Sequence, residues 1–377
     1  MAEDAPVGRS TPSPGHAPQP PLAARTDPLH TRLVDLLGCR YPIVQTGMGW
    51  VSGANLTAAT SAAGGFGILA AVTMTPDQLR DALQAVQERT GAPFGVNFRA
   101  GQPDLTERIN FVTGAGVRLV SFAGAPTREA IARIHDAGGL VMPTVGARRH
   151  AEKMAEWGVD AVIAQGGEGG GHTGTVPTSL LLPQVVDAVA DQVPVVGAGG
   201  FHSGAGLVAA LAYGADGIAM GTRFLLTAES RVPDDVKGTY TAASVFDTVV
   251  TTALDGAPQR VIRTDLVDEL ERASLATRLP RALRNALRFQ RLTATPLREL
   301  VQEGLAMRQQ QRMTWSQVAM AANAPMLIKA ALVDGDASVG VLPTGQVAGV
   351  IDELPPVAEL VGQIVADARA TLERLAG

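Results

Sequence analysis

Cysteine is almost absent from this chain, which contains one, Cys39, among 377 residues. A single thiol forms no disulfide within the chain, and without a neighbouring cluster of Cys and His residues it forms no zinc site. No apolar run approaches the roughly 20 residues of a membrane-spanning helix, and the N-terminus lacks the basic and then apolar segments of a secretion signal. We therefore predict a cytoplasmic protein with no membrane partner.

Excess positive charge is absent as well, because 31 Lys and Arg residues are outnumbered by 36 Asp and Glu residues. The net charge of −5 gives no general field that attracts nucleic acid or an anionic membrane surface. The sequence also lacks a His pair or carboxylate cluster with metal-ligand spacing, and it lacks the G-x-S-x-G motif of serine hydrolases. These absences favour a small-molecule substrate, no nucleic acid and no metal. Whether the chain is a monomer or a homodimer stays open.

Hydrophobic residues make up 46% of the chain, enough for a large core in one or two domains. Residues 1–28 differ, because they hold seven prolines and few large apolar side chains, and we predict a disordered tail there. After the tail, short apolar runs typical of buried strands alternate with Ala-rich stretches of helical spacing. The runs cover residues 42–45, 67–71, 94–98, 118–121, 140–143, 161–164, 194–198 and 217–220.

Eight strands that alternate with helices match the repeat of a (β/α)8, or TIM, barrel, which we expect over residues 29–229. A doubly wound open sheet is the alternative, because alternation alone does not reveal closure. Residues 230–325 are rich in helix formers, with strand character only at 247–252 and 259–264, and predict a mostly helical insertion. Residues 326–377 should then return to the barrel and end in a helix.

The expected insertion carries a stripe of basic residues. Five arginines recur at intervals of three or four, which places them on one helical face: Arg278, Arg281, Arg284, Arg288 and Arg291. Such a stripe is usually a solvated face. The alternative is a docking surface for an anionic group, such as the phosphates of a coenzyme A thioester.

The most informative stretch is Gln165–Gly174, which follows the sixth expected strand and contains six glycines in ten positions. Glycine loses the most backbone freedom on ordering and offers no side chain to pack, so we expect a loop rather than a helix or strand. Its backbone can approach a flat or phosphorylated ligand closely. By letter the stretch contains G-x-G-x-x-G, but Val176-Pro177-Thr178 interrupts the helix that a dinucleotide site requires, so we predict no Rossmann site.

Other chemistry-bearing residues follow the expected strands, where a barrel places its active site. Gly199-Gly200 and Gly221-Thr222 lie after strands 7 and 8, and their N–H groups suit a phosphate. The alternative for each pair is a tight turn that needs glycine for geometry alone. His172, within the glycine run, can exchange a proton near neutral pH and is the candidate catalytic residue. A structural histidine bonded to loop backbone is the alternative.

At these residues the sequence resembles the nitronate monooxygenase family, formerly called 2-nitropropane dioxygenases, which includes flavin-dependent enoyl-thioester reductases. The resemblance runs from about Leu29 to the C-terminus and implies a barrel that binds FMN, with His172 next to the flavin ring. The residues that it implies for FMN binding are Thr46, Gly47, Met48, Asn97, Gln165, Gly170, Gly171, Gly199, Gly200, Ala219, Met220, Gly221 and Thr222.

Departures from the family pattern concern the substrate. The first motif reads Thr46-Gly47-Met48 where the family usually has Ala-Pro-Met, and Gly169 stands where Ala is usual. With Gly345-Gln346, these features resemble a subgroup similar to the flavin-dependent acyl-CoA dehydrogenase of bacterial steroid C/D-ring degradation. That likeness implies a bulky acyl-CoA substrate, for which Arg284, Arg288 and Gln346 are candidate contacts. A nitronate monooxygenase, an enoyl-thioester reductase and a flavoprotein without turnover are the alternatives.

Overall fold

The computed structural model describes residues 27–272 and 323–377. Eight parallel strands close into a barrel in the order β1-β2-β3-β4-β5-β6-β8-β9, and the register of β1 against β9, with Val44 opposite Ala219, completes the ring. The predicted barrel is therefore confirmed and the open sheet is wrong. The strands are β1 (Ile43–Gln45), β2 (Phe66–Ala70), β3 (Gly95–Arg99), β4 (Leu119–Ala123), β5 (Leu140–Val145), β6 (Val162–Gln165), β8 (Val195–Ala198) and β9 (Gly217–Met220).

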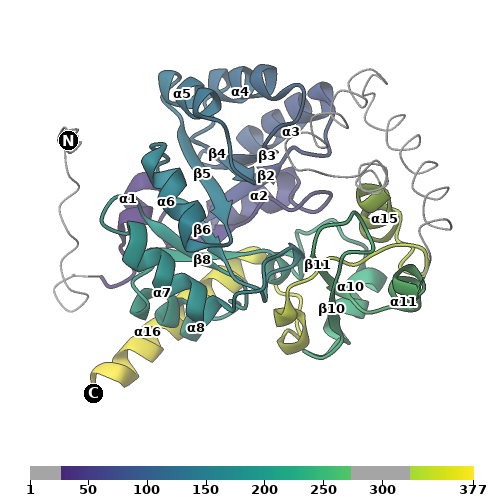
Figure 1. The fold of residues 1–377 in the computed structure, drawn as a ribbon. Helices are drawn as coiled ribbons and strands as arrows, with labels where there is room; N and C mark the ends of the chain where they lie inside the picture. Colours follow the sequence, from purple (N-terminus) through teal and green to yellow (C-terminus); the bar gives the residue numbers. More distant parts are fainter. Residues whose placement is uncertain (1–26, 273–322) are drawn as a thin grey trace, which may run out of the picture.

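Helices follow the strands and cover the outside of the barrel (Figure 1). Their ends carry the expected local signals. Thr75 and Gln78 form a reciprocal capping box at the start of α3, and Pro76 occupies its first turn. Gly158 and Gly214 follow helices with φ of 83° and 87°, a left-handed conformation that ends a helix. The helices are α1 (Arg32–Leu37), α2 (Ala54–Ala62), α3 (Pro76–Arg89), α4 (Leu105–Gly114), α5 (Arg128–Asp136), α6 (Arg148–Glu156), α7 (Thr178–Val189), α8 (Gly204–Ala212) and α9 (Thr222–Leu225).

A buried apolar cluster fills the barrel interior, and α1 belongs to it. Leu33 and Leu37 of α1 pack in the same cluster as Val44, Phe66 and Val196 of the strands. Helix α1 is also tied down by an ion pair, because Arg32 Nη2 lies 2.9 Å from Asp216 Oδ2 just before β9. The first helix therefore closes the end of the barrel where the strands begin, and it leaves the other end uncovered by α1.

The described chain between α9 and the C-terminal helix forms a smaller body beside the barrel (Figure 1). Its described part confirms both stretches of predicted strand character, as β10 and β11, and it has a core of its own around Leu254, Val261 and Leu327. The elements are α10 (Asp234–Thr241), β10 (Thr248–Thr251), β11 (Gln259–Ile262), α11 (Asp265–Arg272), α15 (Asn323–Leu332) and a 3-10 helix, Gln346–Val350.

The chain ends in α16 (Val357–Ala376), which packs against α8 so closely that a Cβ on Gly204 would lie 2.3 Å from the Ile364 carbonyl oxygen. The tail of residues 1–28 and the arginine stripe fall almost entirely outside the described residues. The division of the chain at residues 28, 229 and 325 stays a prediction. None of the helices in the described ranges has the length and apolarity to cross a bilayer.

One expectation about the glycine run is wrong. Gly171–His172 forms a short strand, β7, which pairs antiparallel with β11 in a three-stranded sheet of order β10-β11-β7. Gln259 is paired with His172 and Arg260 with Gly171. The partner strand lies almost 90 residues further along the chain, so local glycine content gave no sign of the pairing.

Candidate active site

The carboxyl ends of β1, β3 and β9 bring the first group of predicted residues together. A Cβ on Gly47 would lie 2.3 Å from Asn97 Cβ, so the loop after β1 lies directly against the end of β3. A Cβ on Gly221 would lie 3.3 Å from both Met48 Sδ and Thr46 Oγ1. These residues form one continuous surface across three strand ends, and glycine permits both close approaches.

Ser52 organises the loop after β1, although the sequence analysis missed it. Its hydroxyl donates to the Thr46 carbonyl oxygen at 2.8 Å and accepts from the Met48 N–H at 2.9 Å. Within the same loop, Trp50 has a φ of 67°, a strained value for a bulky residue. Its indole N–H donates to the Pro325 carbonyl oxygen at 3.2 Å. The loop is therefore fixed both to the barrel and to the chain that returns through α15.

Side-chain hydrogen bonds hold the glycine run in place. The Glu168 carboxylate accepts from the backbone N–H and the hydroxyl of Thr178, at 2.9 and 2.7 Å, and so caps the start of α7. Gln165 donates to the His172 carbonyl oxygen at 2.8 Å and thereby spans the loop. Gly199, with a φ of 97°, lies against the loop, because a Cβ there would be 3.2 Å from Gly169 N. Glu168 and Gln165 thus position the loop backbone.

The returning segment Thr344–Gln346 completes the rim of the site. A Cβ on Gly170 would lie 2.4 Å from the Thr344 carbonyl carbon, and the Gln346 N–H donates to the Glu168 carbonyl oxygen at 2.9 Å. The Gln346 side chain donates to the Val245 carbonyl oxygen at 3.3 Å. Gln346 therefore borders the glycine run, and its role as a substrate contact stays a prediction. The structure brings it there through a contact that no local motif signals.

The side chains of two arginines near the rim donate hydrogen bonds to backbone carbonyl oxygens of the protein. Arg260 of β11 donates from Nη2 to the Gly167 carbonyl oxygen at 2.9 Å, and Arg223 donates to the carbonyl oxygens of Leu226 and Glu353, each at 2.9 Å. Burial lowers the pKa of Arg260, and the charge of Glu168 opposes that shift. Burial likewise lowers the pKa of Arg223. Both guanidinium groups tie loop backbone together beside the site.

His172 lies on β7 at the edge of the glycine run, with a side chain that is 66% exposed. Its Nε2 lies 2.8 Å from Asp255 Oδ2, and Asp255 is almost fully buried in the inserted part of the chain. Sequence reasoning missed Asp255, because nothing in the local pattern around it indicates a partner 83 residues earlier. His202 follows Gly199-Gly200, and its buried Nδ1 has no hydrogen-bond partner among the described residues.

Two predicted substrate contacts, Arg284 and Arg288, lie outside the described residues and stay predictions. In the part of the chain that the structure describes, no group of three His, Cys, Asp or Glu residues is arranged to hold a metal ion.

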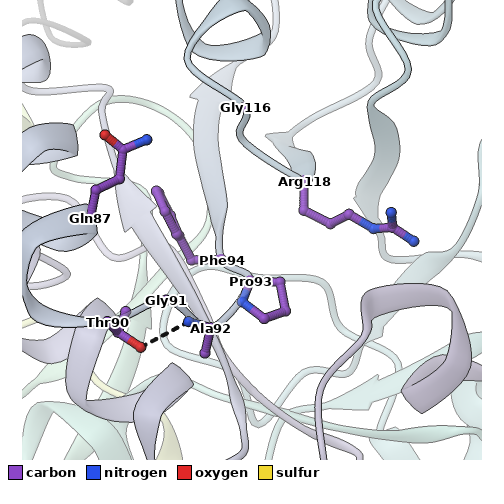
Figure 2. A pocket seen from close by; sticks show the side chains of 8 residues that line it. All are labelled: Gln87, Thr90, Gly91, Ala92, Pro93, Phe94, Gly116 and Arg118. Atoms are coloured by element: carbon purple, nitrogen blue, oxygen red, sulfur yellow. Dashed lines mark hydrogen bonds between the residues drawn. The ribbon is translucent and has the colours of Figure 1, made fainter.

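The residues that line a hollow on the described surface are shown in Figure 2, and they lie at the opposite end of the barrel, because they precede β3 and β4. The hollow is found where β3 and β4 begin, and Phe94 and Arg118 help to line it. Arg118 donates to the Leu36 carbonyl oxygen at 2.9 Å next to the closing helix α1. None of the predicted site residues lines this hollow. In a barrel of this kind, the end where strands begin contributes stability rather than chemistry.

The chain is similar to several known proteins. The family model described as nitronate monooxygenase matches residues 30–113 and 104–367. A Mycobacterium tuberculosis protein, (3aS,4S,5R,7aS)-5-hydroxy-7a-methyl-1-oxo-octahydro-1H-indene-4-carboxyl-CoA dehydrogenase, is 55% identical over 346 residues, or 92% of this chain and 98% of the relative. Its namesake from Rhodococcus jostii is 52% identical over 92% of this chain and 98% of the relative. The solved structure of FabK from Thermotoga maritima has a TM-score of 0.74 at 33% identity, over 92% of this chain and 99% of that chain.

Proposed function

Because this chain belongs to the nitronate monooxygenase family, we propose that it is an FMN-dependent oxidoreductase acting on a CH–CH bond of a bulky acyl-CoA. The observation that carries the proposal is the identity of 55% and 52% to two acyl-CoA dehydrogenases, over 98% of each. Their named substrate is a hydroxylated, methylated oxo-octahydroindene that carries a carboxyl-CoA group. We propose a substrate of the same class here.

The residues at the strand ends fit a flavin, which is the cofactor of this family, and we propose that it is FMN. Gly199 and Gly200 both adopt positive φ, Gly200 is exposed, and two residues further on His202 has a buried Nδ1 without a partner among the described residues. Backbone N–H groups at a glycine turn of this kind suit a phosphate. The Thr222 hydroxyl accepts from Gly345 N–H and keeps its own proton to donate. We assign the phosphate to these residues.

We propose that the residues around Gly47 and Asn97 bind the ring end of FMN. Asn97 is 7% exposed, and its amide N–H donates to Ser121 Oγ at 3.3 Å, which leaves the amide oxygen to accept from a ligand. We propose that Gln165, Gly170 and Gly171 contact the same end of FMN from the glycine run. When bound, the flavin supplies a two-electron acceptor for the hydride of the substrate β-carbon.

His172 supplies the proton chemistry in this proposal. Dehydrogenation of an acyl thioester breaks one C–H bond at the α-carbon, where the proton is acidified by the adjacent carbonyl. A neutral imidazole can accept that proton near neutral pH. The ring of His172, on β7 within the glycine run, is exposed, and we propose that it meets a substrate that enters from solvent. Arg284 and Arg288 are proposed to hold the CoA phosphates, and Gln346 the acyl part.

The experiment is an anaerobic titration of the purified protein. A visible spectrum first identifies bound flavin, and release of the cofactor by denaturation followed by chromatography distinguishes FMN from FAD. Bleaching of the flavin absorbance by a ring-bearing hydroxyacyl-CoA, and its absence with alkyl nitronates, is the expected result. No bleaching by any acyl-CoA, together with rapid oxygen-dependent turnover of alkyl nitronates, overturns the proposal.

A nitronate monooxygenase is the second candidate, because the matching family model carries that description. In that case His172 acts on the nitro compound and no CoA site is required. An enoyl-thioester reductase concerns the same CH–CH bond in the reverse direction, and reduction of an enoyl-CoA by NADH or NADPH would identify it. Cytoplasmic location and the monomer or homodimer state stay predictions of the sequence.

A further inference from the structure

A buried carboxylate lies directly behind the proposed catalytic histidine. Asp255 Oδ2 is 2.8 Å from His172 Nε2, and the Asp255 side chain is 9% exposed, against 66% for His172. The pair joins two parts of the molecule, because His172 belongs to the glycine run of the barrel and Asp255 to the inserted chain. Burying a carboxylate costs free energy unless it is paired and hydrogen-bonded. The histidine and the other donors around Asp255 therefore offset this cost.

Strand pairing sets the geometry of the pair. Gln259 of β11 is the register partner of His172, and Asp255 precedes Gln259 by one tight turn. The Gln259 side-chain N–H donates to Asp255 Oδ2 at 2.5 Å, and the Ala257 backbone N–H donates to Oδ1 at 3.1 Å. Gln259 is 1% exposed, so this network is closed to water on the side away from the histidine. The orientation of the carboxylate is therefore fixed before any substrate binds.

The hydrogen-bond partners of Asp255 decide which nitrogen of His172 carries the proton. An amide N–H and a backbone N–H already donate to Asp255, as suits an ionised carboxylate that only accepts. Nε2 of His172 must then be the donor in their contact. In a neutral imidazole only one nitrogen is protonated, so Nδ1 carries the free lone pair.

We infer that Asp255 is a positioning residue, which selects the Nε2–H tautomer of His172 and thereby makes Nδ1 the atom that accepts the substrate proton. The inference rests on the proposed function of His172 as the base. As the substrate C–H bond breaks, its electron pair stays on carbon and an N–H bond forms at Nδ1. The ring then becomes an imidazolium, and the facing carboxylate stabilises that charge. The inserted chain thus completes the catalytic apparatus of the barrel.

Tautomers are read directly by nitrogen-15 NMR of histidine-labelled holoenzyme at pH 8.5, about two units above the ordinary histidine pKa. Loss of one ring signal pair in His172→Gln identifies the residue. We expect protonated Nε2 and unprotonated Nδ1 in the wild type, and a shift toward protonated Nδ1 in Asp255→Asn, because the new amide can donate to Nε2. A wild-type Nδ1–H tautomer overturns the inference, whatever the enzyme turns over and whether or not the variant folds.

Kinetics gives the second readout. Asp255→Asn should lower kcat by up to about 10⁴-fold, the loss that the wrong tautomer causes in the His–Asp pair of serine proteases, while KM and flavin content change little. The matched control is Asp160→Asn, because Asp160 Oδ2 lies 2.8 Å from His135 Nε2 at a distance from the site. Its kcat should be unchanged. Wild-type kcat in Asp255→Asn contradicts the inference, whereas a wild type that turns over no acyl-CoA or nitronate contradicts only the proposed function.

Discussion

The backbone N–H of Gly345 donates to Thr222 Oγ1 across 2.8 Å, which joins the returning chain to the first residue of α9, just past the end of the last barrel strand. The contact is buried, and Gly345 also lies against the glycine run, since a Cβ there would be 3.1 Å from the Glu168 carbonyl oxygen. The proposed phosphate site and the glycine run therefore share one structural support.

Thr222→Val should weaken both stability and flavin binding. Valine keeps the shape of threonine but leaves the buried Gly345 N–H without an acceptor, at a cost of about 1–3 kcal/mol. It also removes a donor from the proposed phosphate site, so we expect a higher Kd for FMN. The measurements are urea unfolding and titration of apoprotein with FMN, followed by flavin fluorescence.

The control for Thr222 is Thr227→Val. Thr227 is fully buried, and its hydroxyl donates to the Phe224 carbonyl oxygen at 2.7 Å, away from the proposed site. This change should lower stability by a similar amount and leave the Kd for FMN as in the wild type. Equal flavin affinity in the two variants would argue against a phosphate at Thr222.

Gly47→Ala should disrupt the site. The added Cβ would lie 2.3 Å from Asn97 Cβ, so the Asn97 side chain would have to move away from the strand ends. We expect a loss of about 1–3 kcal/mol of stability from overpacking and flavin affinity at least roughly tenfold weaker, equal to about 1.4 kcal/mol. Gly238→Ala is the matched control, because nothing lies within 4 Å of its Cβ position in α10. It should raise stability by about 0.5–1 kcal/mol without changing flavin affinity.

Asp216→Ala should loosen the closed end of the barrel. Asp216 is 1% exposed, and its carboxylate accepts from Arg32 Nη2 at 2.9 Å and from Val195 N–H at 3.0 Å. Removing one partner of such a buried pair costs about 3–5 kcal/mol. Asp77→Ala is the control, because the Asp77–Arg80 pair is largely exposed and such pairs contribute about 1 kcal/mol or less. Urea unfolding of the holoenzyme compares the two, and equal losses would contradict the expected closing role of α1.

Cys39 should be inert in the folded protein. Burial raises the pKa of its thiol to about 12, while hydrogen bonds to the backbone oppose that shift. The pKa of the thiol is higher in the folded protein than in the unfolded chain. Its contribution to the free energy of unfolding is therefore fully present below the unfolded pKa and is lost as the pH rises toward 12. We expect slow alkylation by iodoacetamide at pH 8 and fast alkylation in urea, measured by mass spectrometry. Rapid labelling of the native protein would show that the thiolate is accessible.

Replacement of Arg284 and Arg288 by Ala tests the proposed CoA contacts. We expect the KM for acyl-CoA to rise by about tenfold or more, since hydrogen bonds to charged groups contribute about 1.5–3 kcal/mol each, with kcat changed less. Arg80→Ala and Arg89→Ala on α3 serve as controls for lost positive charge. If KM is the same for the CoA thioester and for a truncated pantetheine thioester, the phosphates are not bound by these arginines.

The local pattern of apolar runs and helix-end residues in the sequence was enough to predict the barrel. The strands are short apolar runs that are buried on both faces, and several helices have a side-chain cap, as α3, α5 and α8 do, or a following glycine, so both signals lie within a few residues of the element they define. Closure puts the strand ends on one rim, and the residues that follow the strands are therefore neighbours. Gly47, Asn97 and Gly221 could be assigned to one site on that basis.

The tertiary structure alone decided how the site is completed. The pairing of His172 with Gln259, the carboxylate of Asp255 behind the histidine, and the contact of Gly345 with Thr222 all join residues more than 80 positions apart. Such contacts depend on the register of a sheet and on the path of the returning chain, and neither of these produces a repeating pattern in the sequence. The sequence by itself determined the barrel and the rim where its strands end, whereas the folded chain determined which carboxylate faces the histidine.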